Sequence, residues 1–149
     1  MSSTVSRILF GFIAGAIAVV TVHELINLIL LNAGLFPRVP WSMAPAAMSG
    51  VPQIVSDMFW GGAWGSLFAL FAANRGNTLL NGAFFGMAGP ALIGVFIAVP
   101  LLTNRFPMFF NGDAKMIGSV LLILAGWGAA TAWLYGMISA RCGAQCAAK

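Results

Sequence analysis

Four long apolar stretches alternate with short polar or proline-rich segments along the chain. About 20 helical residues, at about 1.5 Å of rise each, cross a hydrocarbon core of about 30 Å. The pattern therefore predicts four transmembrane helices, over residues 8–31, 51–73, 78–102 and 116–140. The expected fold is an all-α membrane bundle in which residues 1–149 form a single transmembrane domain.

The polar segments predict how these spans begin, end and bend. Prolines interrupt residues 35–50 and argue against a regular helix there, while Trp41 suits the headgroup layer. The short Asn-Arg-Gly-Asn sequence at 74–77 predicts a tight turn, so the second and third spans form a helical hairpin. Gly89-Pro90 lies near the middle of the third span and predicts a kink, because proline removes a backbone hydrogen bond.

The composition identifies lipid as the main partner. Hydrophobic residues make up 60% of the chain and charged residues 7%, against about 25% in soluble domains. So few charged side chains cannot cover a soluble exterior, and the apolar surface must face the bilayer. The net charge of +4 does not indicate nucleic-acid binding, because the basic residues are scattered singly.

The basic residues also bear on orientation. Four spans place both termini on one side of the membrane, together with Arg7, Arg75, Arg141 and Lys149. The opposite side carries Arg38, Arg105 and Lys115. Cytoplasmic segments are enriched in basic residues, so the small excess favours cytoplasmic termini.

Small residues spaced four apart predict close helix packing in every span. In membranes, helices associate through close backbone approach, for which glycine leaves room. We expect packing at the pairs Gly11 and Gly15, Gly61 and Gly65, and Gly82 and Gly86, and on one face of the fourth span at Gly118, Gly126 and Ala130. These stripes could hold one bundle together, or bind a second copy or another membrane subunit, and the sequence does not separate the two.

One polar constellation lies within the apolar spans. His23, Glu24 and Asn27 lie in the first span, about 24 Å from its start if that helix begins near residue 8. Asp57 enters the second span from the same side to a similar depth, so the four side chains meet if the two spans touch. Inserting an acidic or basic side chain at the centre of a membrane helix costs roughly 2.5–3.5 kcal/mol of free energy on insertion scales. Such residues are therefore functional candidates by default.

Two interpretations of this constellation stay open. In the structural one, His23 and Asn27 hydrogen-bond across helices while Glu24 reaches headgroup water. In the functional one, the group binds a proton, a cation or a solute. Either Arg38 or Arg105 could act as a counter-ion, or Glu24 could stay protonated.

The sequence predicts no catalytic residue, metal site or cofactor. The His23-Glu24 pair resembles the start of a His-Glu-x-x-His zinc motif, but Asn27 takes the place of the second histidine. The chain contains one histidine in all, and paired acids, bases and nucleophiles are scarce. We therefore expect that the protein is not an enzyme.

Three short motifs carry a resemblance. They are Asn81 to Gly86 (NGAFFG), Ala132 to Gly136 (AWLYG) and the Phe36-Pro37-Arg38 exit from the first span. With the four-span layout, they resemble small four-span bacterial inner-membrane proteins of unknown function. The resemblance implies a bacterial plasma-membrane setting and transfers no functional residue.

Two functional hypotheses follow. The first is a structural or accessory helical bundle, or a self-associating one. The alternative is a small transporter or channel that uses the intramembrane His-Glu site, with the third span lining a cavity at Gly89-Pro90.

Overall fold

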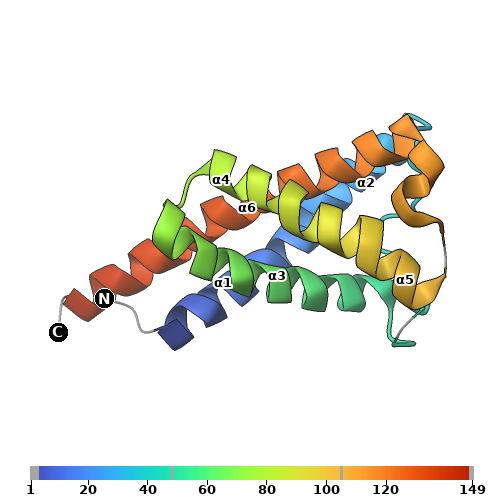
Figure 1. Cartoon of the computed structure of the whole chain (residues 1–149). Coiled ribbons are helices and arrows are strands. Elements are labelled where there is room, and N and C mark those ends of the chain that lie inside the picture. The colour runs from blue at the N-terminus through green and yellow to red at the C-terminus, as the bar shows by residue number, and fades with distance from the viewer. Residues whose placement is uncertain (1–3, 48, 105, 148–149) are drawn as a thin grey trace.

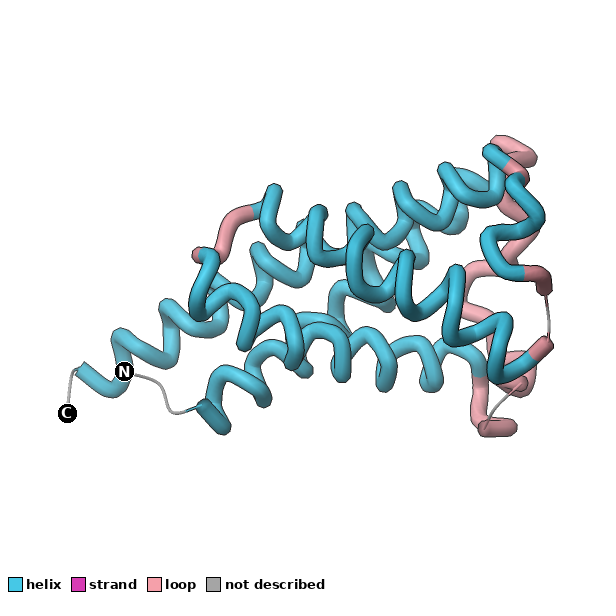
Figure 2. Tube along the Cα trace, viewed as in Figure 1, coloured by secondary structure: helices cyan, strands magenta, loops and turns pink. Residues whose placement is uncertain are grey.

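A computed structural model describes residues 4–47, 49–104 and 106–147 (Figures 1 and 2). This part of the chain is helical and contains no strand. Four of its helical segments are long and apolar enough to cross a membrane: Thr4–Asn32, Gln53–Arg75, Leu79–Thr103 and Ala114–Cys142. They overlap the predicted spans along most of their length and confirm the all-α membrane bundle.

Two of the spans are divided by wider helical turns. The first consists of α1 (Thr4–Ala18), the π-helical turn η1 (Val19–His23) and α2 (Glu24–Asn32). The second is α3 (Gln53–Arg75). The third consists of α4 (Leu79–Gly86), the π-helical η2 (Met87–Ala98) and α5 (Val99–Thr103). A short 3₁₀ segment, η3 (Met108–Gly112), precedes α6 (Ala114–Ala147).

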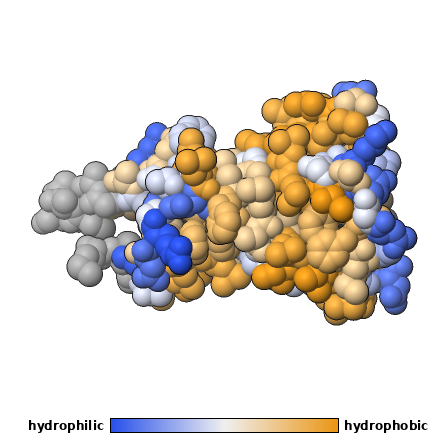
Figure 3. Space-filling view, turned by 45° about the horizontal axis from the view of Figure 1, so that its top comes forward, coloured by the Kyte–Doolittle hydropathy of each residue, from blue (hydrophilic) through white to orange (hydrophobic). Residues whose placement is uncertain are grey.

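The surface has the layout of a multi-pass membrane protein. Apolar side chains cover the middle of the face in Figure 3, and polar residues gather toward its two ends. Leu80 is 81% exposed and Trp133 58% exposed, which is unfavourable in water but suits contact with lipid. The termini lie at one end of the bundle, and the loops after α2 and α5 lie at the other (Figure 1).

The first two spans pack through their glycines. A Cβ added to Gly11 would collide with the carbonyl oxygen of Gly65, and one added to Gly15 with that of Gly61. Only hydrogen at these positions lets the two backbones touch. The glycine pairs of α1 and α3 therefore face one another inside the bundle.

The third and fourth spans pack in the same manner. A Cβ on Gly82 would collide with the carbonyl oxygen of Gly128, and one on Gly86 with that of Leu124. Of the two glycines expected to pack in α6, Gly126 lies against the Ile26 side chain of α2. Gly118 is exposed, and the described part of the chain places nothing within 4 Å of the position of its Cβ. The contact with α4 uses Gly128, because glycine spacing alone does not fix which face of a helix meets which neighbour.

These contacts reveal an internal repeat. Gly11 lies against a glycine carbonyl and the Cβ of Ala69, and Gly82 lies against a glycine carbonyl and the Cβ of Ala132. The partner glycines both follow a tryptophan, in Trp64-Gly65 and Trp127-Gly128. Spans one and two therefore form a hairpin that spans three and four repeat in the same orientation.

The π-helical turns recur at matching places in the two hairpins. Val19 follows Gly15 by four residues and Pro90 follows Gly86 by four, and both lie in π-helical segments. In the first, the Glu24 N–H bonds back to the Val19 carbonyl, and in the second the Val99 N–H bonds to Gly94. The chain thus accommodates Pro90, which lacks an N–H, within a long π-helical stretch that includes the predicted Gly89-Pro90 distortion.

Candidate intramembrane polar site

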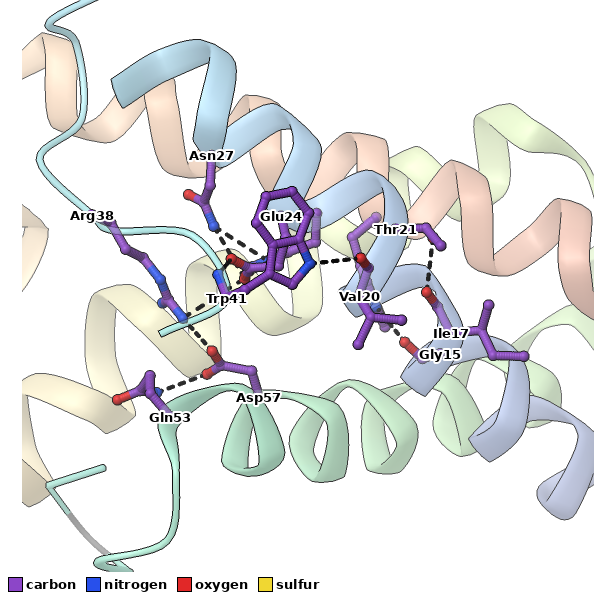
Figure 4. Close-up of polar contacts among 12 residues, drawn as sticks. Gly15, Ile17, Val20, Thr21, Glu24, Asn27, Arg38, Trp41, Gln53 and Asp57 are labelled. Carbon is purple, nitrogen blue, oxygen red and sulfur yellow. Dashed lines mark hydrogen bonds and ion pairs between the residues drawn. The ribbon is translucent and has the colours of Figure 1, made fainter. Parts of the chain in front are cut away.

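The four polar residues selected from the sequence belong to one cluster, shown in part in Figure 4. His23, Glu24 and Asn27 come from the first span, and Asp57 from α3. The segment between these spans adds Arg38 and Trp41. All three elements meet at the loop end of the bundle, away from the termini (Figure 1).

His23 and Glu24 contact one another at the junction where η1 passes into α2. Consecutive side chains of a regular α-helix do not usually face one another. Here the His23 Nδ1 lies 2.9 Å from Glu24 Oε1. The Glu24 side chain is buried, with 1% of its surface exposed. The sequence spacing does not predict this buried contact.

The contact between His23 and Glu24 contains a shared proton. An unprotonated imidazole nitrogen and a carboxylate oxygen are both acceptors, so a 2.9 Å separation requires hydrogen between them. Either His23 Nδ1–H donates to the carboxylate, or a protonated Glu24 donates to the ring nitrogen. The bridging hydrogen belongs to His23 in the first arrangement and to Glu24 in the second, and the second carries one proton more than a neutral His23 beside an ionised Glu24.

Asn27 completes the buried side of the pair. Its Nδ2 lies 3.4 Å from both His23 Nδ1 and Glu24 Oε1, so it can donate only weakly to either. The residue is completely buried, and its Oδ1 has no hydrogen-bond partner among the described residues. A buried acceptor without a hydrogen bond destabilises the folded protein by about 1–3 kcal/mol. This oxygen is therefore a candidate for accepting a hydrogen bond from a bound ligand.

Trp41 closes the cluster from the loop side. Its backbone N–H donates to Glu24 Oε2 at 2.7 Å, and its indole Nε1–H donates to the Val20 carbonyl at 3.0 Å. The residue has a φ of 46°, in the left-handed region that an aromatic residue rarely adopts. These contacts fix the proline-rich segment onto the first span and stabilise the strained backbone.

Asp57 joins the cluster through Arg38. Its Oδ2 pairs with Arg38 Nη2, and its Oδ1 accepts from Gln53 Nε2 at 2.8 Å. The same Arg38 nitrogen lies 4.0 Å from Glu24 Oε1. The guanidinium therefore stands between two carboxylates from different spans, and Asp57 reaches the His23–Glu24 pair only through it.

The charges of the cluster do not cancel when both of its carboxyl groups are ionised. With a neutral His23, the two carboxylates and one guanidinium leave one negative charge among mostly buried groups. A second proton on the imidazole, or a bound cation, would neutralise it. No group of three His, Cys, Asp or Glu side chains in the described ranges is arranged to hold a metal ion.

Sequence reasoning found part of this site. The four residues and the counter-ion Arg38 were among its candidates, whereas Arg105, the other suggested counter-ion, lies outside the described residues. The Trp41 backbone N–H was missed, and so was the direct contact between the neighbours His23 and Glu24. A backbone donor carries no side-chain signal, although the depth of Trp41 suggested an interfacial position.

Comparison with protein-family models, with curated proteins and with solved structures finds no match to this chain. The similarity to small four-span bacterial membrane proteins stays a prediction.

Proposed function

We propose that the protein is a small membrane transporter in which the His23–Glu24 pair is the protonation site. The observation that supports this most directly is a buried carboxylate held 2.9 Å from the single histidine of the chain. Ionisable residues at membrane depth are costly, and they mark proton and solute pathways in membrane proteins. A carboxyl and an imidazole that share a proton are suited to accepting and releasing one.

The internal repeat allows the hairpin that contains the polar cluster to be compared with one that lacks it. Counted from the glycine pairs, the second hairpin has Gly94, Val95 and Ala98 where the first has His23, Glu24 and Asn27. The second hairpin therefore makes the same glycine contacts without polar groups at these positions. A hairpin of this type can therefore pack without a polar cluster, which supports a functional role for the cluster in the first hairpin.

Access to the cluster differs on its two sides. Toward the loops, the Arg38 side chain is 33% exposed and Asp57 18% exposed, so water can reach them. Toward the termini, the buried Trp127 donates its indole N–H to Gly15. Transport requires movement on the Trp127 side, and the π-helical turns supply helix segments that can change their hydrogen bonding.

Flux measurements in liposomes test the proposal. Purified protein is reconstituted, a pH gradient is imposed, and internal pH is followed with a panel of ions and small solutes outside. We expect pH-dependent flux in the wild type, loss of flux in Glu24→Gln, and unchanged flux in Asp113→Asn. Asp113 is a matched carboxyl-to-amide control, because it caps the start of α6 outside the cluster. Absence of flux across the panel, or full flux in Glu24→Gln, would overturn the proposal.

A structural or accessory role is the second candidate. The observation that favours it is the bond from Trp41 N–H to Glu24, which anchors the segment between α2 and α3. In this case Glu24→Gln lowers thermal stability in detergent while the wild type shows no flux. The glycine pairs face one another within the bundle, which supports a role for them in the folding of one chain.

The setting is part of the same proposal. We place the protein in the bacterial inner membrane with cytoplasmic termini, on the resemblance and on the slight excess of basic residues at the terminal end. The cluster then opens toward the outer face, where a proton or solute would enter.

A further inference from the structure

Arg38 occupies the position that a bound cation would take. Its Nη2 pairs with Asp57 Oδ2 and lies 4.0 Å from Glu24 Oε1, so one guanidinium contacts carboxylates from two spans (Figure 4). Gln53 holds the other oxygen of Asp57 and orients that carboxylate toward the arginine. The two acids therefore form a receptor for a planar cation with several N–H donors.

The arginine belongs to a connecting segment and not to a span. No described residue between α2 and α3 is helical, and Trp41 ties this segment to the bundle near Glu24. The Arg38 side chain is one-third exposed, so it can leave for water without unfolding a helix. Its removal would leave the cluster with a neutral His23 and two negative charges, a state that either protonation or another cation would relieve.

Asn27 supplies an independent sign of a ligand. Its side-chain amide is directed into the cluster, it is completely buried, and its Oδ1 has no partner among the described residues. The other side chains near the guanidinium are Glu24, His23, Asp57 and Gln53, and none of them donates to this oxygen. A ligand with more N–H groups than one tethered arginine presents could satisfy it.

We propose that this site binds a guanidinium-type organic cation, for which Arg38 is the built-in substitute. This cation class would be the substrate of the proposed transporter, and its transport rests on the proposed function. Binding itself does not depend on transport. Arg38 competes with the cation from within the chain, and a tether of this kind gives it a millimolar effective concentration. Removing the arginine side chain should therefore strengthen binding of a free cation.

Chemical rescue tests this proposal on the full-length protein in detergent. The variants are Arg38→Ala and Arg38→Gln, the latter retaining length and N–H donors in case the former fails to fold. The thermal unfolding temperature of each variant is measured in millimolar guanidinium and, separately, in millimolar tetramethylammonium. Tetramethylammonium carries the same charge as guanidinium but has no N–H donor. We expect both variants to melt below the wild type, and guanidinium to restore at least half of the loss. Tetramethylammonium should restore none.

Direct binding of radiolabelled guanidinium supplies the second measurement. Arg38→Gln should bind at least about tenfold more tightly than the wild type, a difference of about 1.4 kcal/mol. The double variant Glu24→Gln/Arg38→Gln should lose this gain. The control is Arg75→Ala, because Arg75 lies over the Phe71 ring at the other end of α3 and should show neither rescue nor tighter binding.

Equal rescue by both cations would indicate charge screening and would overturn the proposal. Absence of rescue together with unchanged binding would overturn it as well. If proton flux still depends on Glu24 in that case, the proposed substrate class is wrong and the proposed transporter function is retained. If guanidinium binds and no flux is found, the binding site is supported and the proposed transporter function is wrong.

Discussion

The indole nitrogen of Trp127 lies 3.0 Å from the carbonyl oxygen of Gly15 and donates a hydrogen bond to it. Trp127 is 1% exposed, and Gly15 also contacts Gly61, so α1, α3 and α6 meet at this point. The bond links the first hairpin to the second beside the glycine contact.

Trp127→Phe should weaken the junction between the hairpins without preventing folding. The change keeps most of the buried ring and removes the indole N–H, so we expect a loss of about 0.6–2 kcal/mol, the range for hydrogen bonds between helices in membranes. Reversible unfolding in detergent measures it. Trp133→Phe is the control, because Trp133 is 58% exposed and should leave stability unchanged. Equal effects from the two changes would contradict the assigned role of the bond.

Gly15→Ala should destabilise the folded chain by at least about 1–3 kcal/mol, the usual cost of overpacking. The added Cβ would collide with the Gly61 carbonyl, and neither backbone can move without separating α1 from α3. Gly118→Ala is the matched control, with room for the methyl group and a gain of up to about 1 kcal/mol in helix propensity. Thermal unfolding of the monomer checks both. A change confined to oligomeric state would instead support self-association through these stripes.

Glu24→Ala should release the segment that carries Trp41. The variant removes the acceptor of the Trp41 N–H, and a buried bond to a charged group contributes about 1.5–3 kcal/mol. Hydrogen exchange of the Trp41 amide should therefore speed up by at least about tenfold, since 1.4 kcal/mol corresponds to that factor. Asp113→Asn should leave it unchanged. Unaltered protection in Glu24→Ala would show that other contacts hold the segment in place.

Single-cysteine labelling should place the two ends of the bundle on opposite sides of the membrane. Cys142 lies at the terminal end of α6, and Asn104 ends α5 at the loop end. In intact bacterial cells, a membrane-impermeant maleimide should label Asn104→Cys in a cysteine-free background, and should leave Cys142 unlabelled until the cells are opened. The reverse pattern would invert the proposed orientation.

The sequence predicted which residues could meet at the site but not how. Glu24 and Asp57 lie at similar depths in neighbouring spans, and depth follows directly from helical rise. Whether they touch directly depends on rotation of the helices and on the intervening segment. In the structure Arg38 separates them, and Trp41 contributes a backbone N–H that residue identity does not reveal.

The glycine stripes also show what the sequence predicts and what only the tertiary structure decides. In spans one to three, the expected glycines face a neighbouring helix. In α6 the contact is made by Gly128 together with Leu124, and Gly118 is exposed. Several small residues lie on α6, and only the crossing position of its partner α4 selects among them.

The amino-acid sequence by itself determined that the chain crosses a membrane four times, because the free energy of moving a helix into lipid depends on its length and composition. Both can be counted along the chain without reference to any other segment. The tertiary structure alone decided that the hairpins repeat one another and that Trp41 contributes a backbone N–H to Glu24. It also decided that a loop arginine occupies the site, because these features depend on contacts between residues far apart in the chain.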